Sequence, residues 1–105
     1  MLNDTLRKDI EQTIRNNKIV LYMKGTLDSP MCGFSGRVAQ ILQSYNRPIK
    51  AINILEDEDL RQGIKEFSNW PTIPQIYING ELIGGCDIVT EMHETGELKT
   101  LLAKV

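Results

Sequence analysis

The apolar run Ile19–Met23 limits the folds open to this chain more than any other segment. All five residues are apolar, whereas a strand with one solvent-facing side alternates between apolar and polar residues. A strand without that alternation is typical of a sheet that is covered on both faces. We therefore expect a central strand with helices above and below it. Lys24-Gly25 ends this strand, and residues 26–30 are expected to form a loop.

Helical and strand patterns alternate through the rest of the chain. Apolar residues recur at helical spacing in four segments, which are residues 4–16, 32–45, 56–67 and 86–102. Gly96 interrupts the last of these segments. An apolar pattern predicts a second strand over residues 49–55. Asn79-Gly80 separates two further short apolar segments, and Asn-Gly in this setting predicts a β-hairpin.

The predicted elements follow the order helix, strand, helix, strand, helix, hairpin, helix. A right-handed crossover would place the first two strands parallel, and the hairpin would add two antiparallel strands. We therefore expect an α/β domain with a four-stranded mixed sheet and helices on both faces, which is the thioredoxin-like arrangement. A chain of 105 residues suits one domain, so residues 1–105 are expected to form it alone.

Charge and composition argue against several classes of partner. The net charge of −2 is not that of a general nucleic-acid binder or of a polybasic membrane-docking protein. No apolar run approaches the ~20 residues that span a bilayer, and residues 1–8 lack the apolar core of a signal peptide. The two cysteines, Cys32 and Cys86, are expected to be free thiols in a reducing compartment. We expect the cytoplasm, with a processed mitochondrial protein as the alternative.

The segment Cys32-Gly33-Phe34-Ser35 resembles a Cys-x-x-Cys redox motif in which serine replaces the second cysteine. Two thiols at this spacing can form and open an internal disulfide, because the thiolate of one attacks the other sulfur. A thiol and a hydroxyl cannot. The motif must therefore obtain a second sulfur from elsewhere, or bind a ligand through its single sulfur without redox cycling.

The expected position of Cys32 favours a reactive thiol. At the start of a helix the sulfur faces unpaired backbone N–H groups and the positive end of the helix dipole, and both stabilise thiolate. Lys24, at the end of the preceding strand, would add positive charge. The alternative is an inert buried cysteine. Ser35, one turn later, could donate a hydrogen bond to the thiolate or could satisfy a backbone group, and the sequence favours neither.

Two turns elsewhere in the chain are further candidates for ligand binding. A cis bond at Ile73-Pro74 would offer the Ile73 backbone to an extended peptide-like ligand, although most X-Pro bonds are trans. The turn Gly84-Gly85-Cys86-Asp87 precedes a helix, and a helix N-terminus can bind an anion. The same turn could be a tight connection that Asp87 caps.

Four motifs, in this order and spacing, resemble those of the monothiol glutaredoxins of the CGFS type. They are Lys24-Gly25, Cys32-Gly33-Phe34-Ser35, Trp70-Pro71-Thr72-Ile73-Pro74 and Gly84-Gly85-Cys86-Asp87. The resemblance covers nearly the whole chain and matches the single-domain form of the family. It implies a thioredoxin fold with a groove that binds glutathione.

The resemblance also implies a role for each residue of the groove. Lys24 and Arg61 would meet the glycine carboxylate of glutathione, and Lys65, one turn after Arg61, is a further candidate. The Ile73 backbone would pair with the cysteinyl unit. The γ-glutamyl end would be held by Gly85, Cys86 and Asp87. Cys32 would be both the catalytic residue and the ligand of a [2Fe–2S] cluster, whereas the chemical role of Cys86 stays open.

A [2Fe–2S] cluster usually has four thiolate ligands. One chain of this family supplies one, so two chains and two glutathiones would complete the set in a cluster-bridged homodimer. The first hypothesis is therefore a carrier that passes a labile cluster to apo iron–sulfur proteins, with BolA-like proteins as further partners. The second is a glutathione-dependent thiol–disulfide oxidoreductase. A disulfide between Cys32 and Cys86 would indicate a third, redox-sensing use.

Overall fold

The computed structural model describes residues 2–105. The predictions for the segment 1–8 and for the domain 1–105 each include residue 1, which lies outside the described part. The described part contains five α-helices, one short 3-10 helix and four strands. In chain order they are α1 (Asp4–Asn16), β1 (Ile19–Met23), α2 (Gly33–Gln43), β2 (Lys50–Asn53), η1 (Ile54–Glu56), α3 (Glu58–Ser68), β3 (Gln75–Ile78), β4 (Glu81–Gly84), α4 (Cys86–Thr95) and α5 (Glu97–Ala103).

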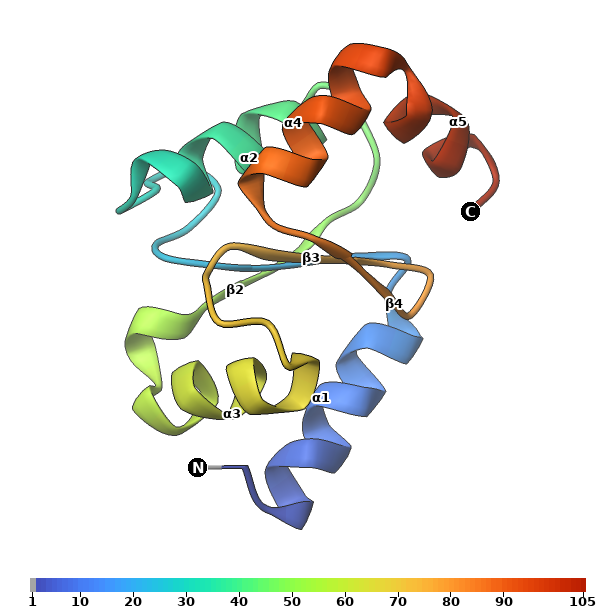
Figure 1. Cartoon of the computed structure of the whole chain (residues 1–105). Coiled ribbons are helices and arrows are strands. Elements are labelled where there is room, and N and C mark those ends of the chain that lie inside the picture. The colour runs from blue at the N-terminus through green and yellow to red at the C-terminus, as the bar shows by residue number, and fades with distance from the viewer. Residues whose placement is uncertain (1) are drawn as a thin grey trace.

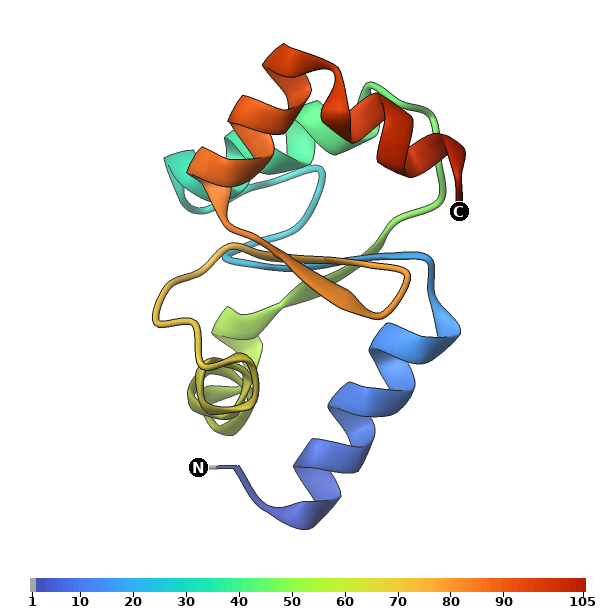
Figure 2. The same cartoon turned by 45° about the vertical axis from the view of Figure 1, so that its right-hand side comes forward.

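The four strands form one mixed sheet in the order β2-β1-β3-β4. β1 runs parallel to β2, whereas β3 is antiparallel to both β1 and β4. In Figure 1, α2, α4 and α5 lie above this sheet, and α1 and α3 lie below it. Figure 2 shows the same layers after a turn of the molecule. The predicted thioredoxin-like fold is confirmed.

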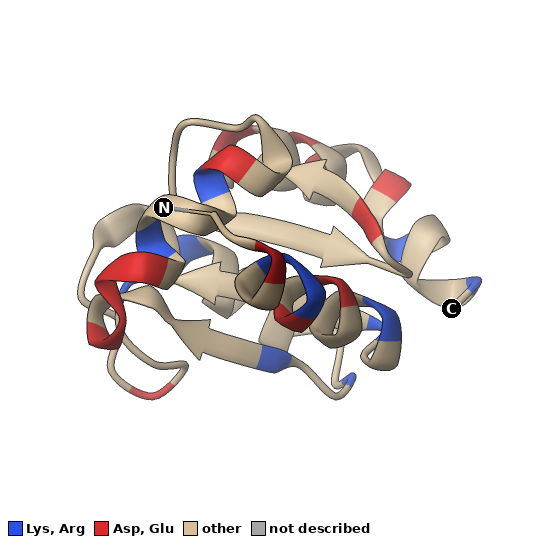
Figure 3. Cartoon of the chain, turned by 90° about the horizontal axis from the view of Figure 1, so that it is seen from below, with Lys and Arg blue, Asp and Glu red and all other residues tan. Residues whose placement is uncertain are grey.

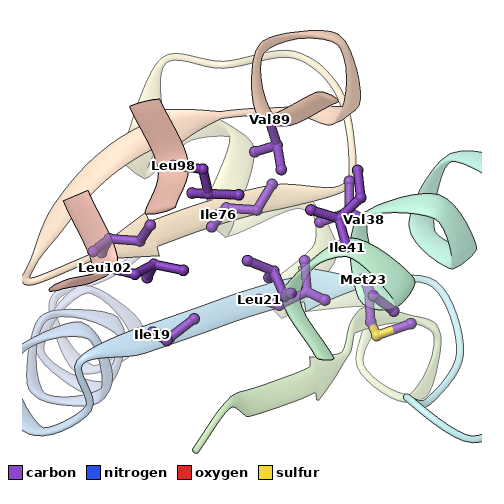
Figure 4. Close-up of a cluster of buried hydrophobic side chains, with 12 residues drawn as sticks. Ile19, Leu21, Met23, Val38, Ile41, Ile76, Val89, Leu98 and Leu102 are labelled. Carbon is purple, nitrogen blue, oxygen red and sulfur yellow. The ribbon is translucent and has the colours of Figure 1, made fainter. Parts of the chain in front are cut away.

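β1 lies in the middle of the molecule because its side chains enter two separate cores. Ile19, Leu21 and Met23 point to the upper core, which α2, α4 and α5 cover (Figure 4). Val20 and Tyr22 point to the lower core, which α1 and α3 cover. All five side chains are buried. The uniform apolar run therefore reflects burial on both faces, as its composition predicted.

The second strand is shorter than predicted. The sequence indicated a strand over residues 49–55, but β2 ends at Asn53 and the chain turns into the 3-10 helix η1. The Asn53 side chain causes this turn, because its Oδ1 accepts a hydrogen bond from the backbone N–H of Leu55 at 3.0 Å. Ile54 then enters the lower core from a helical turn, not from a strand.

Local capping residues set several helix ends. The Asn3 side chain accepts from the Leu6 N–H at the start of α1, and the Asp57 side chain accepts from the Leu60 N–H at the start of α3. Gly96, with φ of 86°, separates α4 from α5 at the predicted interruption. Acidic and basic residues are interspersed along α1 and α3 on the lower face (Figure 3). None of the helices in residues 2–105 has the length and apolar character of a membrane span.

Candidate functional site

Cys32 lies at the N-terminal end of α2, as the sequence predicted. It is the N-cap residue of this helix, and its carbonyl accepts the first helical hydrogen bond from the Gly36 N–H at 2.9 Å. The loop from the end of β1 is closed by a second bond of 2.9 Å, from the Met31 N–H to the Lys24 carbonyl. These two bonds place the thiol beside the end of the central strand.

Gly25 makes this loop possible. Its φ of +94° lies in the left-handed region that residues with a side chain rarely adopt. A Cβ at this position would lie 2.5 Å from both the Met31 backbone nitrogen and the Ser29 carbonyl oxygen. The chain can therefore double back from Lys24 to Cys32 only because residue 25 has no side chain.

The surroundings of the Cys32 sulfur favour the thiolate. The backbone N–H of Ser35 lowers the pKa of the thiol most, burial opposes this by raising it, and the Phe34 N–H and the Lys24 charge lower it further. The Cys32 side chain makes no capping hydrogen bond to the start of α2, so the backbone N–H groups act on the sulfur mainly as oriented dipoles. The net pKa lies below the ordinary value, and the thiol is half-buried rather than part of either core.

Ser35 is fully buried, and its hydroxyl has a structural partner. Its Oγ accepts a hydrogen bond from the Lys24 backbone N–H at 3.1 Å. The hydroxyl also makes a small contribution to the lowered pKa of Cys32, weaker than those of the backbone N–H groups and of Lys24. Both interpretations of this serine are therefore met by the one side chain, since the oxygen accepts from the backbone and the hydrogen remains for the sulfur.

A groove of about 660 Å³ opens beside the Cys32 sulfur. Its walls come from the end of β1, the start of α2, one face of α3, the segment before β3 and the start of α4. It is lined by six of the seven residues that the sequence singled out, which are Lys24, Cys32, Ile73, Gly85, Cys86 and Asp87. The fold thus brings together residues that are up to 63 positions apart in the chain.

Arg61 is the seventh residue, and it does not line the groove. Its guanidinium lies 3.8 Å from the Glu58 carboxylate on the same helix. Lys65, one turn later, lines the groove together with Lys24. Two lysines therefore supply the positive charge of the groove in this structure, whereas Arg61, one turn before Lys65 on α3, does not line it.

The wall opposite Cys32 is a turn held by Gln75. The Ile73-Pro74 bond is cis, and neither the N–H nor the C=O of Ile73 has a hydrogen-bond partner within residues 2–105. Gln75 is fully buried, and its Nε2 donates to the Trp70 carbonyl at 3.0 Å and to the Thr72 carbonyl at 3.3 Å. The turn therefore presents the backbone of Ile73 as an unpaired donor and acceptor.

The third wall is the start of α4. Gly85 is its N-cap residue, and the helix has no side-chain cap, so the first N–H groups of α4 are free. A Cβ on Gly85 would lie 3.2 Å from the Pro74 carbonyl oxygen and 3.4 Å from Trp70 Nε1. Gly85 thus lets the α4 N-terminus pack closely against the turn before β3. An anion in the groove would meet the positive end of this helix.

A sequence model of the family described as Glutaredoxin matches residues 19–83, which is more than half of the chain. This chain belongs to the glutaredoxin family. Several of its relatives are named monothiol glutaredoxins. The chain is 54% identical over 103 residues to "Monothiol glutaredoxin-S14, chloroplastic" of Arabidopsis thaliana. The aligned part is 98% of this chain and 60% of that protein. The chain is 53% identical over 102 residues to "Probable monothiol glutaredoxin 2" of Rickettsia conorii, with 97% and 95% covered.

Solved structures agree with this assignment. The solution structure of reduced poplar apo GrxS14 superposes with a TM-score of 0.83 at 52% identity, over 94% of this chain and 91% of that one. Further relatives carry mitochondrial names, so bacterial, mitochondrial and chloroplast proteins all resemble this chain. The predicted membership of the monothiol glutaredoxins is confirmed.

Sequence reasoning missed two residues that shape the groove of this glutaredoxin. Gln75 stands at the start of an apolar strand, and a polar residue at that position was a signal for a buried hydrogen-bonding role. Asn53 accepts a hydrogen bond from the Gly25 N–H at 2.9 Å. The sequence could not indicate this contact, because its partner lies 28 residues earlier in the chain.

A second cavity of about 600 Å³ adjoins the groove on its α2–α4 side. The two cavities share Cys32, Phe34, Cys86 and Asp87. Phe34 is 62% exposed and Met31 is 68% exposed, so the sulfur lies within an apolar rim that is open to solvent. A ligand in the groove would leave this side of Cys32 accessible to a second molecule.

Proposed function

We propose that this monothiol glutaredoxin binds glutathione in the groove and carries a labile [2Fe–2S] cluster between two chains. The cluster is its cargo, which it passes to apo iron–sulfur proteins. The single observation that carries the proposal is the arrangement at Cys32: one accessible thiol of lowered pKa, followed by a buried serine that already holds a backbone group.

The shape and chemistry of the groove suit glutathione, a tripeptide with a central thiol and a carboxylate at each end. Cys32 lines the groove, so its sulfur is available to a thiol-bearing ligand there. The unpaired backbone of Ile73 can form a strand-like pair with the cysteinyl unit. Lys24 and Lys65 can meet one carboxylate, and the α4 N-terminus at Gly85-Cys86-Asp87 can meet the other. We assign Arg61 an outer contribution to the same positive end.

The number of available ligands supports a shared cluster. In residues 2–105, no three His, Cys, Asp or Glu side chains lie together in an arrangement that could hold a metal ion. We assign Cys32 as the one ligand that each chain gives to the cluster, and a four-thiolate set then needs three more. A second chain and two glutathiones supply them. Glutathione exchanges freely with solvent, so a cluster held in this way is suited to transfer.

Reconstitution under anaerobic conditions tests this proposal. The protein is incubated with iron, sulfide and glutathione, then examined by visible absorption and size-exclusion chromatography. We expect a coloured dimer that forms only when glutathione is present. Cys32→Ser should be a colourless monomer, whereas Ser44→Ala, at the far end of α2, should behave as the wild type. A colourless monomeric wild type under these conditions would contradict the proposal.

The accessible thiolate also favours a second candidate, a glutathione-dependent oxidoreductase. The Cys32 thiolate would attack the glutathione sulfur of a glutathionylated protein, forming a Cys32–glutathione disulfide and releasing the protein thiolate. A second glutathione thiolate would then attack that disulfide, release oxidised glutathione and regenerate Cys32. Turnover of a glutathionylated peptide, measured beside a glutaredoxin with two active-site cysteines, decides between the candidates. Comparable turnover would favour the enzyme.

We place the protein in a reducing compartment, the cytoplasm in the first instance, with a processed mitochondrial form as the alternative. Both cysteines are free in the structure, which suits such a compartment. BolA-like proteins remain proposed partners of the cluster-bound form. Cell fractionation with an antibody against the protein tests the compartment directly.

A further inference from the structure

The backbone on both sides of Lys24 is held by hydrogen bonds to three different parts of the chain. Its N–H donates to the Ser35 Oγ of α2 at 3.1 Å, and its carbonyl accepts from the Met31 N–H at 2.9 Å. The next N–H, that of Gly25, donates to the Asn53 Oδ1 at the end of β2 at 2.9 Å. Two of the three partners are side chains.

These side chains are built for this contact. Ser35 is completely buried, so water cannot replace the Lys24 N–H as the hydrogen-bond donor to its Oγ. The Oδ1 of Asn53 accepts from both the Gly25 N–H and the Leu55 N–H, and so joins the loop after β1 to the turn after β2. Neither residue lines the groove. Asn53 can therefore act on the groove only through the backbone that it holds. Ser35 acts through the same backbone, and its hydroxyl also contributes to the lowered pKa of the Cys32 thiol.

Lys24 needs such support because its side chain is long and flexible. A lysine ammonium contributes as a point charge, and its position in the groove depends on the direction in which its Cα–Cβ bond leaves the backbone. Lys24 stands where β1 ends and the chain reverses through Gly25. Without the side chains of Ser35 and Asn53, the bond from the Met31 N–H to the Lys24 carbonyl would be the one left of these three.

We propose that Ser35 and Asn53 are positioning residues that aim the Lys24 ammonium into the glutathione groove; this rests on the proposed binding of glutathione. Serine at position 35 then has a function of its own and is more than a missing cysteine. Restoring the two-thiol motif with Ser35→Cys would replace a good acceptor by sulfur, which accepts hydrogen bonds weakly. The second thiol and the Lys24 anchor are therefore alternatives at this one position.

Amide hydrogen exchange tests the positioning without any ligand. Ser35→Ala and Ser35→Cys should speed exchange at the Lys24 amide by about tenfold or more relative to the wild type. Asn53→Ala should do the same at the Gly25 amide, whereas Asn53→Asp keeps an acceptor oxygen and should leave it slow. The control Ser44→Ala removes a hydroxyl that bonds within its own helix, to the Ile41 carbonyl. Unchanged exchange at Lys24 in Ser35→Ala would overturn the proposal.

A double-mutant cycle tests the effect on the groove. Glutathione affinity is measured through the fluorescence of Trp70, which lines the groove and is the one tryptophan of the sequence. Lys24→Ala and Ser35→Ala should each weaken binding by about three- to tenfold. Their double variant should bind no more weakly than Lys24→Ala alone. The loss in Ser35→Ala should shrink at high salt, because it acts through a charge.

The two arms separate failure of this inference from failure of the proposed function. A wild type that does not bind glutathione overturns the proposed function, while the exchange rates still show whether the two side chains hold the loop. Additive losses in Ser35→Ala and Lys24→Ala, with normal glutathione binding by the wild type, overturn the positioning role alone. Poor folding of Ser35→Ala would leave Asn53→Ala against Asn53→Asp as the deciding pair.

Discussion

At the scale of single residues, neighbours decide what each polar side chain can do. Cys32 faces backbone N–H groups at the start of α2, and these lower its pKa although burial opposes them. Ser35, one turn later, is buried and accepts a hydrogen bond from the backbone N–H of Lys24, which directly follows β1. The two residues belong to one motif, yet one is available to a ligand and the other is committed to the fold.

The lowered pKa of Cys32 predicts that its thiol is alkylated at a lower pH than an ordinary thiol. Its rate of reaction with iodoacetamide should rise with pH to a midpoint below that of a free small thiol such as glutathione, because the thiolate is the nucleophile. Lys24→Gln should move the midpoint upward by a small amount, since the lysine is a weaker influence than the Ser35 N–H. Mass spectrometry of the alkylated peptide follows the reaction. A midpoint at or above that of glutathione would contradict the described environment.

Gly25 and Gly33 provide a matched pair of glycine substitutions. Gly25→Ala should destabilise the protein by about 1–3 kcal/mol, because the residue has φ of +94° and a Cβ would meet two backbone atoms. Gly33→Ala should be neutral or stabilising by up to about 1 kcal/mol, since nothing lies within 4 Å of its Cβ position in the first turn of α2. Urea unfolding measures both. Equal effects of the two changes would refute the role of Gly25.

At the scale of secondary-structure elements, local patterns predicted the order of helices and strands but not every boundary. The apolar pattern of residues 49–55 continues past Asn53, and only the side chain of Asn53 turns the chain into η1. Arg61 and Lys65 share one face of α3, so helical spacing could not tell which of them reaches the groove. The packing of α3 against the sheet decided for Lys65.

Arg47 connects the end of α2 to the end of α5. Its guanidinium donates to the carbonyls of Leu102 and Val105, which are among the last carbonyls of the chain. Arg47→Met should destabilise the protein by about 1–2 kcal/mol, because the charged donor is lost from two carbonyls. It should also speed amide exchange in α5 before exchange in α2. Arg7→Met, on the exposed side of α1, is the control, and equal effects of the two changes would refute the role of Arg47.

At the scale of the whole molecule, β1 couples the two layers. The upper and lower cores contain different residues, but they meet at alternate side chains of this strand, and its neighbour β3 does the same with Ile76 and Ile78 above and Tyr77 below. Loss of packing in either layer therefore weakens the sheet on which both depend. The groove uses the same arrangement, because its walls come from both layers: α2 and α4 from above, and α3 from below.

Leu98→Ala tests this coupling. Leu98 is fully buried in the upper core, and its truncation should destabilise the protein by about 2–5 kcal/mol. Trp70 follows α3 and lines the groove, to which both layers contribute walls, so its fluorescence reports on a part of the molecule outside the upper core. We expect fluorescence and far-ultraviolet circular dichroism to give one coincident unfolding transition, shifted by the same amount. Two separate transitions would show that the layers unfold independently.

The sequence by itself determined the layered fold, the central strand and the single thiol at the start of a helix. Each of these depends on residues close together in the chain: an unbroken apolar run, helical periodicity and a cysteine just before a helical pattern. Only the tertiary structure decided the hydrogen-bond partner of Ser35, the positions of Asn53 and Gln75, and the cis form of Ile73-Pro74. It also decided that Lys65, and not Arg61, is the basic residue of α3 that lines the groove. The physical reason is distance along the chain. The bonds from Lys24 to Ser35 and from Gly25 to Asn53 join residues 11 and 28 positions apart, and no local sequence pattern records such contacts.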